Sequence, residues 1–186
     1  MSKVAIVGDP SGTGTFTISA PNGNTDRTLV LPDEAGTIIT TAGVPASAMP
    51  AGSVIQVVSS AYSTQATTTS SSYVDTGLTA SITPSSASNI ILVLVNMSGL
   101  YINNPNNYAK AMLVRNSTQL GEFLGAAGYS TTSVGVGAGG MSYADSPATT
   151  SAVTYKVQVL SATSGQIVYW SNNSSKCTLT LMEIVV

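Results

Sequence analysis

The stretch Asn89-Ile-Ile-Leu-Val-Leu-Val95 decides the fold class, because every residue after its asparagine is apolar and the run is only long enough for a strand. An apolar run of this length without polar alternation is typical of a strand that is buried on both faces. We therefore expect a second β-sheet against one face of this strand. We leave open that another subunit covers the opposite face.

Segments that alternate between apolar and polar residues flank this stretch, and Gly, Pro, Asn and Ser separate them. Helical periodicity is nearly absent, and the spacing is typical of a β-sandwich or jelly roll of about eight to ten antiparallel strands. The segments that we expect to be strands are 54–59, 73–75, 78–83, 89–97, 109–115, 119–124, 140–144, 152–160, 166–170 and 177–185. The glycine-rich run 134–140 is expected to form a flexible loop or a turn.

The chain ends in an apolar alternating segment, 178–186, without a polar tail. An exposed apolar strand at a sheet edge invites aggregation, so we expect this strand to be central in its sheet or to lie at a subunit interface. Cys177, the single cysteine, is the first residue of the expected strand 177–185 and directly precedes this segment. We predict that it is a buried structural thiol, since a catalytic thiol needs a histidine partner and the chain has no histidine.

The first forty residues predict short strands with few large side chains. Phe16 and Ile18 share one face of the first, and Leu29 and Leu31 share one face of the next. Strands this short are stable if several copies of the chain wrap around a common axis.

The run 41–52 contains two prolines and two glycines and shows no alternation. We expect it to be a semi-rigid linker. The predicted organisation is therefore an N-terminal segment (1–40), a linker (41–52) and a β-sandwich domain (53–186).

The composition argues against an enzyme. The chain has no histidine, and charged residues make up 8% of it, against about 25% in an ordinary globular domain. Most catalytic designs need a titratable base, a metal ligand or an activated nucleophile, so we predict no catalytic residues, no metal site and no cofactor.

Charge and hydropathy also bear on the partners. Six Lys and Arg residues and a net charge of −2 argue against nucleic-acid binding. No apolar run has the length of a transmembrane segment. We expect neither a nucleic-acid partner nor membrane insertion.

The carboxylates leave one enzymatic alternative open. A glycosidase needs two carboxyl groups that face each other across a cleft. Asp33 and Glu34 are adjacent in a predicted turn, a placement that rarely directs two side chains to one substrate. Whether Asp75, Glu122 and Asp145 meet in the fold is a question that their positions in the sequence leave open.

The aromatic residues suggest a recognition surface. Tyr101, Tyr108, Tyr129 and Tyr143 are predicted at strand ends or in loops rich in Asn, Gly and Ser, where tyrosine suits stacking on sugar rings or protein contacts. The alternative is that these tyrosines cover the ends of the sandwich or subunit seams. Tyr169 and Trp170 are adjacent and should face opposite sides of their strand.

The N-terminal block 8–40 resembles a segment found in virion proteins of tailed bacteriophages. The resemblance rests on Gly12-Thr-Gly-Thr-Phe-Thr-Ile-Ser19 and on Arg27-Thr-Leu-Val-Leu-Pro32. In tail-fibre and fibre-like proteins, such a block precedes a linker and a β-rich distal domain. The resemblance implies that Phe16, Ile18, Leu29 and Leu31 belong to a virion anchor.

Later blocks are similar to the C-terminal domain of the same group. They are Gly52-Ser-Val-Ile-Gln-Val-Val58, Ile82-Thr-Pro-Ser-Ser-Ala-Ser-Asn-Ile-Ile-Leu-Val93 and Leu179-Thr-Leu-Met-Glu-Ile184. The resemblance implies a homotrimer and carries over no catalytic residue. The chain differs from a long fibre protein because it has almost no shaft between its two blocks. A head fibre or a capsid decoration protein therefore remains an alternative.

Three functions follow as hypotheses. The first is a non-enzymatic virion structural protein: a homotrimer, assembled in the host cytoplasm, that contacts other capsid or tail proteins through residues 1–40. The second is a host-attachment protein whose knob binds a surface glycan or protein. The third is a polysaccharide depolymerase.

Overall fold

The computed structural model describes residues 11–15, 17, 23–24, 26, 28, 44, 48–104, 106–124 and 134–186. The chain divides into two units, Met1–Ile38 and Ile39–Val186, and the strands of the described residues all lie in the second. The predicted anchor residues Phe16, Ile18, Leu29 and Leu31 lie outside the described residues, as does Tyr129. Their roles stay predictions.

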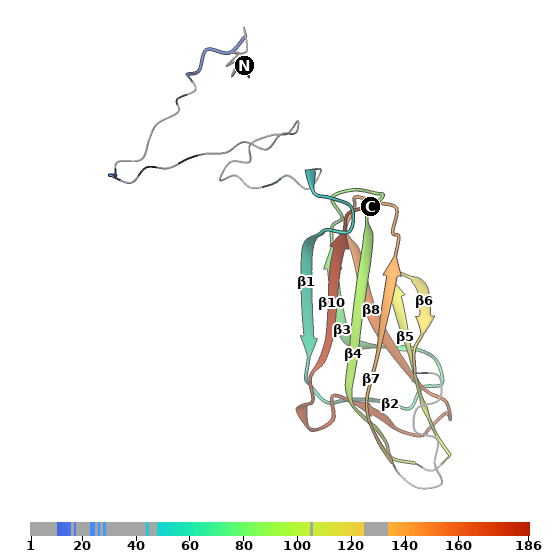
Figure 1. The fold of residues 1–186 in the computed structure, drawn as a ribbon. Coiled ribbons are helices and arrows are strands. Elements are labelled where there is room, and N and C mark those ends of the chain that lie inside the picture. The colour runs from blue at the N-terminus through green and yellow to red at the C-terminus, as the bar shows by residue number, and fades with distance from the viewer. Residues whose placement is uncertain are drawn as a thin grey trace. The chain divides into compact units, whose positions relative to one another are not determined.

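Ten strands are formed by the described residues, and they pack as a two-layer antiparallel sandwich (Figure 1). The strands are β1 (Val54–Tyr62), β2 (Ala66–Thr68), β3 (Val74–Ile82), β4 (Ile90–Ile102), β5 (Ala109–Arg115), β6 (Thr118–Glu122), β7 (Val134–Asp145), β8 (Val153–Ser161), β9 (Val168–Trp170) and β10 (Cys177–Ile184). A short 3₁₀ turn, η2 (Asn172–Ser174), lies between β9 and β10.

The strand order is that of a jelly roll. Sheet A runs β1-β10-β4, with β7 on the far side of β4, and sheet B runs β3-β8-β5-β6. The short strands β2 and β9 form a ribbon that joins the end of β4. If β2 and β9 are set aside, the remaining eight strands pair from the outside inward. The first pairs with the last (β1 with β10), and the next pairs are β3 with β8, β4 with β7 and β5 with β6. This nested pairing is a long hairpin rolled into two sheets, and it confirms the predicted fold class.

The pattern of β4 decides which of its faces meets the core. Ile91, Val93 and Val95 are buried between the sheets, whereas Leu94 points outward and is 37% exposed. The predicted second sheet is therefore confirmed. The outer face of β4 faces away from sheet B.

Sheet B supplies the opposite wall of the core through the alternation of β8, in which every second residue from Val153 to Ser161 is buried. Each fully buried aliphatic side chain contributes about 1.5–3 kcal/mol relative to an exposed one. The largest fully buried side chains include Tyr155, Leu78, Ile91, Met97, Leu113, Leu179 and Leu181.

The final strand lies inside sheet A. β10 pairs with β1 on one side and with β4 on the other, so the prediction of a central strand is confirmed. The buried thiol is confirmed as well: Cys177 is fully buried, and its Sγ accepts a hydrogen bond from the Ser98 backbone N–H at 3.3 Å.

Two local predictions were wrong, and one strand was missed. The glycine-rich run 134–140 is the first half of β7, which pairs with β4 along most of its length. A Cβ at Gly140 would lie 2.6 Å from the Val95 carbonyl oxygen, so glycine is what allows β7 to approach β4 closely. Segments 73–75 and 78–83 belong to one strand, β3, whose pairing with β8 shifts between Asp75 and Thr79. The strand β2 was not predicted.

Candidate functional site

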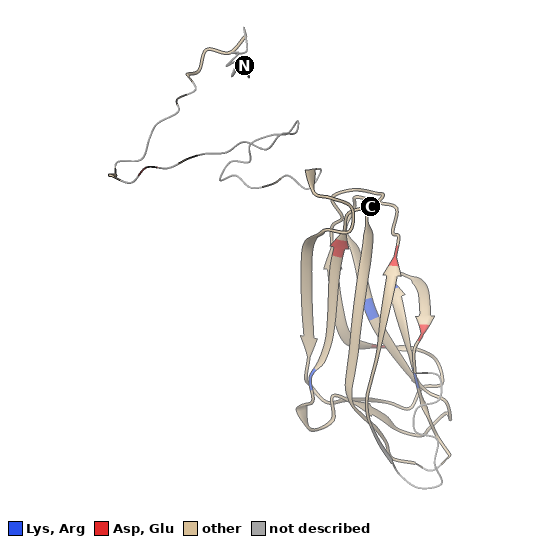
Figure 2. Cartoon of the chain, in the orientation of Figure 1, with Lys and Arg blue, Asp and Glu red and all other residues tan. Residues whose placement is uncertain are grey.

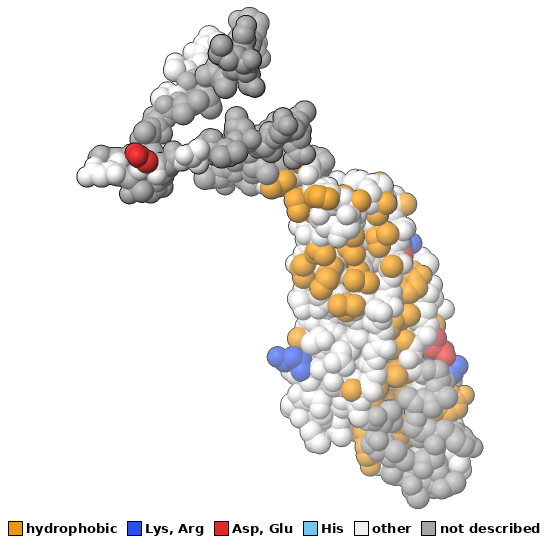
Figure 3. Space-filling view, viewed as in Figure 1, with side chains coloured by type: hydrophobic (Ala, Val, Ile, Leu, Met, Phe, Trp, Pro, Cys, Tyr) orange, Lys and Arg blue, Asp and Glu red, His pale blue; other side chains and the backbone are white. Residues whose placement is uncertain are grey.

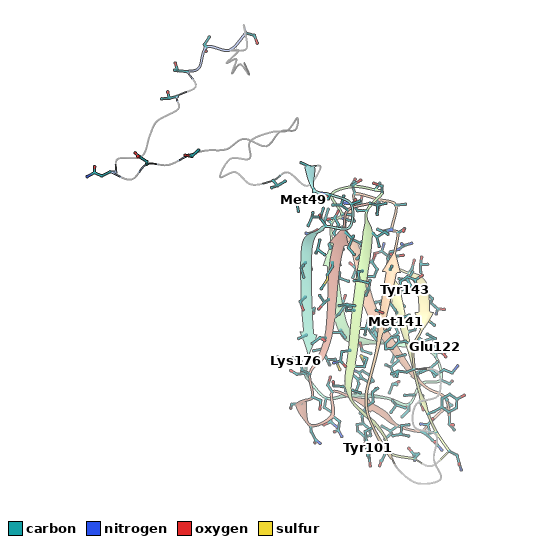
Figure 4. All side chains as sticks on the ribbon, in the orientation of Figure 1. Met49, Tyr101, Glu122, Met141, Tyr143 and Lys176 are labelled. Atoms are coloured by element: carbon teal, nitrogen blue, oxygen red, sulfur yellow. The ribbon has the colours of Figure 1, made fainter. Side chains whose placement is uncertain are left out.

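Two tyrosines form a pair on the outer face of sheet A. Tyr101 on β4 is the register partner of Tyr169 on β9, and their ring centroids lie 5.7 Å apart with the planes inclined by 60°. Both side chains are half-buried. Figure 4 shows Tyr101 near the end of the sandwich at which β2 lies.

A backbone irregularity turns Tyr101 outward. Gly99 has φ +64°, and the pairing of β4 with β7 shifts on both sides of Leu100. Leu100 and Ile102 are buried as a result, and Tyr101 between them faces out. A Cβ at Gly99 would lie 2.5 Å from the backbone nitrogen of Asn172, so this turn of the chain requires glycine.

The neighbouring strand is fixed from within the sandwich. Trp170 is buried, and its indole N–H donates a 3.0 Å hydrogen bond to the Thr76 carbonyl of β3 in sheet B. The Thr76 hydroxyl in turn donates to the Val157 carbonyl at 2.8 Å. Because Trp170 points inward, the preceding Tyr169 points outward, as the sequence predicted for this adjacent pair.

The predicted tyrosine set does not form one surface. Tyr143 lies near the end of β7, where it is the register partner of Val93 and packs against the core. Figure 4 shows Tyr143 on β7, well separated from Tyr101. Tyr108 is half-buried just before β5, and its carbonyl accepts a hydrogen bond from Ala162 at 3.0 Å. Sequence reasoning did not include Tyr169 in the set, although its alternation with Trp170 was visible.

The carboxylates on the outer face of sheet B are each held by neighbours. Asp75 accepts hydrogen bonds from Lys156 (2.9 Å) and Gln158 (2.7 Å). The bonds from Lys156 and Gln158 hold the pKa of Asp75 below its usual range despite the opposing effect of burial. This arrangement suits a solvated ion pair at the surface.

Glu122 occupies a second polar cluster at the other edge of sheet B. It accepts a hydrogen bond from the phenol of Tyr73 and lies 3.2 Å from the Lys110 ammonium. The bond from Tyr73, together with Lys110, lowers the pKa of Glu122. Partial burial and the neighbouring carboxylate raise the pKa of Tyr73, so its phenol stays protonated and donates.

The third carboxylate, Asp145, points inward instead. It is paired with Arg115 and also accepts a hydrogen bond from Tyr155. Asp75, Glu122 and Asp145 are thus held in three separate interactions with different partners.

Glu183 is the most deeply buried of the described carboxylates, with 1% of its surface exposed. Its Oε1 accepts hydrogen bonds from the Ser85 backbone N–H (2.6 Å), the Ser85 hydroxyl (2.7 Å) and the Asn89 amide (2.8 Å). Burial raises the pKa of Glu183, but the bonds from Asn89 and Ser85 outweigh it and the net pKa is lowered. The carboxylate thereby ties the β3–β4 connection to β10.

The described residues contain no group of three or more His, Cys, Asp and Glu side chains that could hold a metal ion. Within the same part of the chain, no helix has the length and hydropathy that a bilayer crossing requires. The described residues do bring together an aromatic pair at one end of sheet A and small polar clusters on sheet B.

Comparison with known proteins adds no assignment: no protein-family model matches the chain, and no curated protein is significantly similar to it in sequence.

Proposed function

We propose that this chain is a non-enzymatic structural protein of a tailed-phage virion, a homotrimeric fibre-like or capsid decoration protein. Residues 1–40 attach it to the capsid or tail, and the β-sandwich is its outward knob. The observation that carries the proposal is the resemblance of block 8–40, and of the later blocks, to virion proteins of that group.

The fold is compatible with this role. Jelly rolls occur in viral capsid and lectin domains, although a fold alone does not define a function. The described side chains give further support, because Asp75, Glu122, Asp145 and Glu183 are all engaged in hydrogen bonds or ion pairs that hold strands and loops together. A depolymerase would need two of them to converge on a substrate, so it has the least support.

Immunogold labelling tests the proposal. Antibodies against the knob should label intact particles of the phage that encodes the chain, and absence of the protein from purified particles would refute the proposal. A chain without residues 1–40 should be lost from the particles. If the shortened chain is incorporated at the normal level, residues 1–40 are not the virion anchor, but the proposed structural role is unaffected.

A second candidate function is host attachment, and the Tyr101–Tyr169 pair favours it. Partly exposed aromatic rings with an apolar body and a polar tip suit contact with sugar rings or with protein side chains. Binding of the purified full-length chain to host cells, measured by co-sedimentation, tests this function.

A further inference from the structure

The outer face of sheet A carries an apolar patch that the core does not use. We define the patch by Val54 and Val57 on β1, Leu92 and Leu94 on β4, and Met182 and Ile184 on β10. The register places Val57 beside Met182, Met182 beside Leu92, and Val54 beside Ile184. The six side chains therefore form adjoining rows on one surface, which Figure 3 shows as the hydrophobic area over β1, β10 and β4.

A bulge in β1 enlarges the patch. Residues three apart on a regular strand point to opposite faces, but the pairing of β1 with β10 shifts between Val54 and Gln56. One extra residue in a strand resets its alternation. Val54 and Val57 consequently both point outward, with 46% and 57% of their surfaces exposed.

The exposed large hydrophobic residues of the described chain concentrate here. Val54, Val57 and Leu94 are three of the five such residues, and a fourth, Val186, lies two residues beyond Ile184 of the patch. Scattered apolar residues at a surface are ordinary, but a contiguous apolar patch marks an interaction site.

Charge indicates what covers the patch. Among the described residues, the charged side chains on the four strands of this face are Glu183 and Asp145, and both are buried on the inner side. The ion pairs of Asp75 and Glu122 lie on sheet B, and Lys176, labelled in Figure 4, lies just before β10. Figure 2 shows how few segments of the strands are charged. A nucleic acid or a charged peptide would find no partner on the patch. Three copies around a threefold axis can each turn this neutral surface toward the axis, so the surfaces meet without repulsion between like charges.

The size of the face suits an interface between copies. Four strands about 4.8 Å apart, over six to eight residues each, present on the order of 500 Å² in projection. Side-chain relief makes the accessible area larger, which brings it to the scale of the roughly 800 Å² that each partner buries in a standard interface. Beside the patch, Thr180, Ser59 and Ser142 continue the face as a polar band. An apolar centre with a polar rim is the usual composition of such an interface.

We propose that the outer face of sheet A is the surface through which copies of this chain associate. The inference rests on the proposed function, because it names the surface that holds together the homotrimer of that proposal.

The mass of the full-length chain in solution tests the inference. Light scattering and sedimentation velocity should give the mass of three chains for the wild type. Leu94→Lys and Val57→Lys should each weaken association at least tenfold and yield single chains at concentrations where the wild type is assembled. Gln119→Lys on β6 places the same charge at an exposed position of sheet B and should leave the mass unchanged.

The outcomes separate the inference from the proposed function. If both lysine variants keep the wild-type mass and melting temperature, the outer face of sheet A is not the association surface, whereas the proposed homotrimer is retained. A monomeric wild type refutes both the face and the homotrimer, whereas immunogold labelling decides the virion role independently. Should Leu94→Lys fail to fold, Val57→Lys carries the test, because more than half of its side chain is exposed and its substitution spares the core.

Discussion

Asp145 on β7 and Tyr155 on β8 join the two sheets through a 2.6 Å hydrogen bond from the Tyr155 phenol to the Asp145 carboxylate. Arg115 on β5 adds a charge, since its Nη1 lies 2.9 and 2.7 Å from the two carboxylate oxygens. Tyr155 is fully buried, and burial and the adjacent carboxylate raise the pKa of its phenol. The phenol therefore stays protonated and keeps donating across the sandwich.

Asp145→Asn should lower the free energy of unfolding because it leaves the Arg115 charge without its partner. Breaking a buried pair costs about 3–5 kcal/mol, and since Arg115 remains partly exposed we expect about 2–3 kcal/mol. Urea unfolding followed by tryptophan fluorescence measures the change. Tyr155→Phe keeps the ion pair and should cost about 1–2 kcal/mol. An Asp145→Asn protein as stable as the wild type would show that the cross-sheet pair contributes nothing.

Glu183 should make the stability fall in acid. Its pKa is lowered in the folded chain from an ordinary value of 4.5, so below that pH the unfolded state binds protons more readily than the folded state. The stabilisation is present above pH 4.5 and is lost as the pH falls through the lower value of the folded chain.

Glu183→Gln isolates this contribution. We expect it to lower the free energy of unfolding at neutral pH by about 1–3 kcal/mol and to flatten the dependence of stability on pH below 4.5. Melting temperatures between pH 7 and pH 3 measure both effects. An unchanged acid slope in the variant would assign the acid sensitivity to other carboxylates, such as Asp75 and Glu122, whose pKa values are also lowered.

Gly99→Ala should destabilise the end of sheet A for two reasons. Its φ of +64° disfavours a side chain, and the new Cβ would lie 2.5 Å from the Asn172 backbone nitrogen. Gly165→Ala is the matched control, because Gly165 also has a positive φ (+83°) but has open space around its Cβ position. We expect about 1 kcal/mol for Gly165→Ala and about 2–4 kcal/mol for Gly99→Ala. Equal melting temperatures for the two variants would contradict the close approach of η2 to β4.

Strands could be predicted from the sequence where their residues alternate clearly between apolar and polar or are rich in β-branched side chains. This holds for β5, β8 and β10. In these strands the residue pattern predicts both the strand itself and the face that is buried. β7 was half missed because its first residues are mostly glycine and carry no alternation. Met141 and Tyr143 alternate with Ser142 and Ala144 within the expected strand 140–144, so the inward direction of Tyr143 could have been predicted from that segment.

The site was less predictable because it depends on pairing between distant segments. Tyr101 and Tyr169 are far apart in the sequence, and only the register of β4 with β9 brings their rings together. The outer patch depends on the bulge near Gln56. No residue typical of a turn lies there to predict it from the sequence. Local patterns predict faces of strands, whereas neighbours across a sheet are set by topology.

If the knob binds host surfaces, Tyr101→Ala and Tyr169→Ala should each weaken that binding. Interface hot spots lose more than about 1.4 kcal/mol on truncation, which is a tenfold loss of affinity, and we expect at least this for each ring. The two effects should be non-additive, because the ring centroids lie only 5.7 Å apart and neighbouring side chains are energetically coupled. Titration of host cells or of a glycan array with labelled protein measures the affinity.

Tyr73→Ala provides the matched control for this measurement. It removes the same side chain from the outer side of sheet B, where the phenol bonds to Glu122, and should leave binding within twofold of the wild type. If Tyr73→Ala weakens binding as much as Tyr101→Ala, the loss reflects general destabilisation and the tyrosine pair is not the contact surface. If neither Tyr101→Ala nor Tyr169→Ala weakens binding, their packing serves the end of the sandwich, because an aromatic pair that bridges β4 and β9 also stabilises their short pairing.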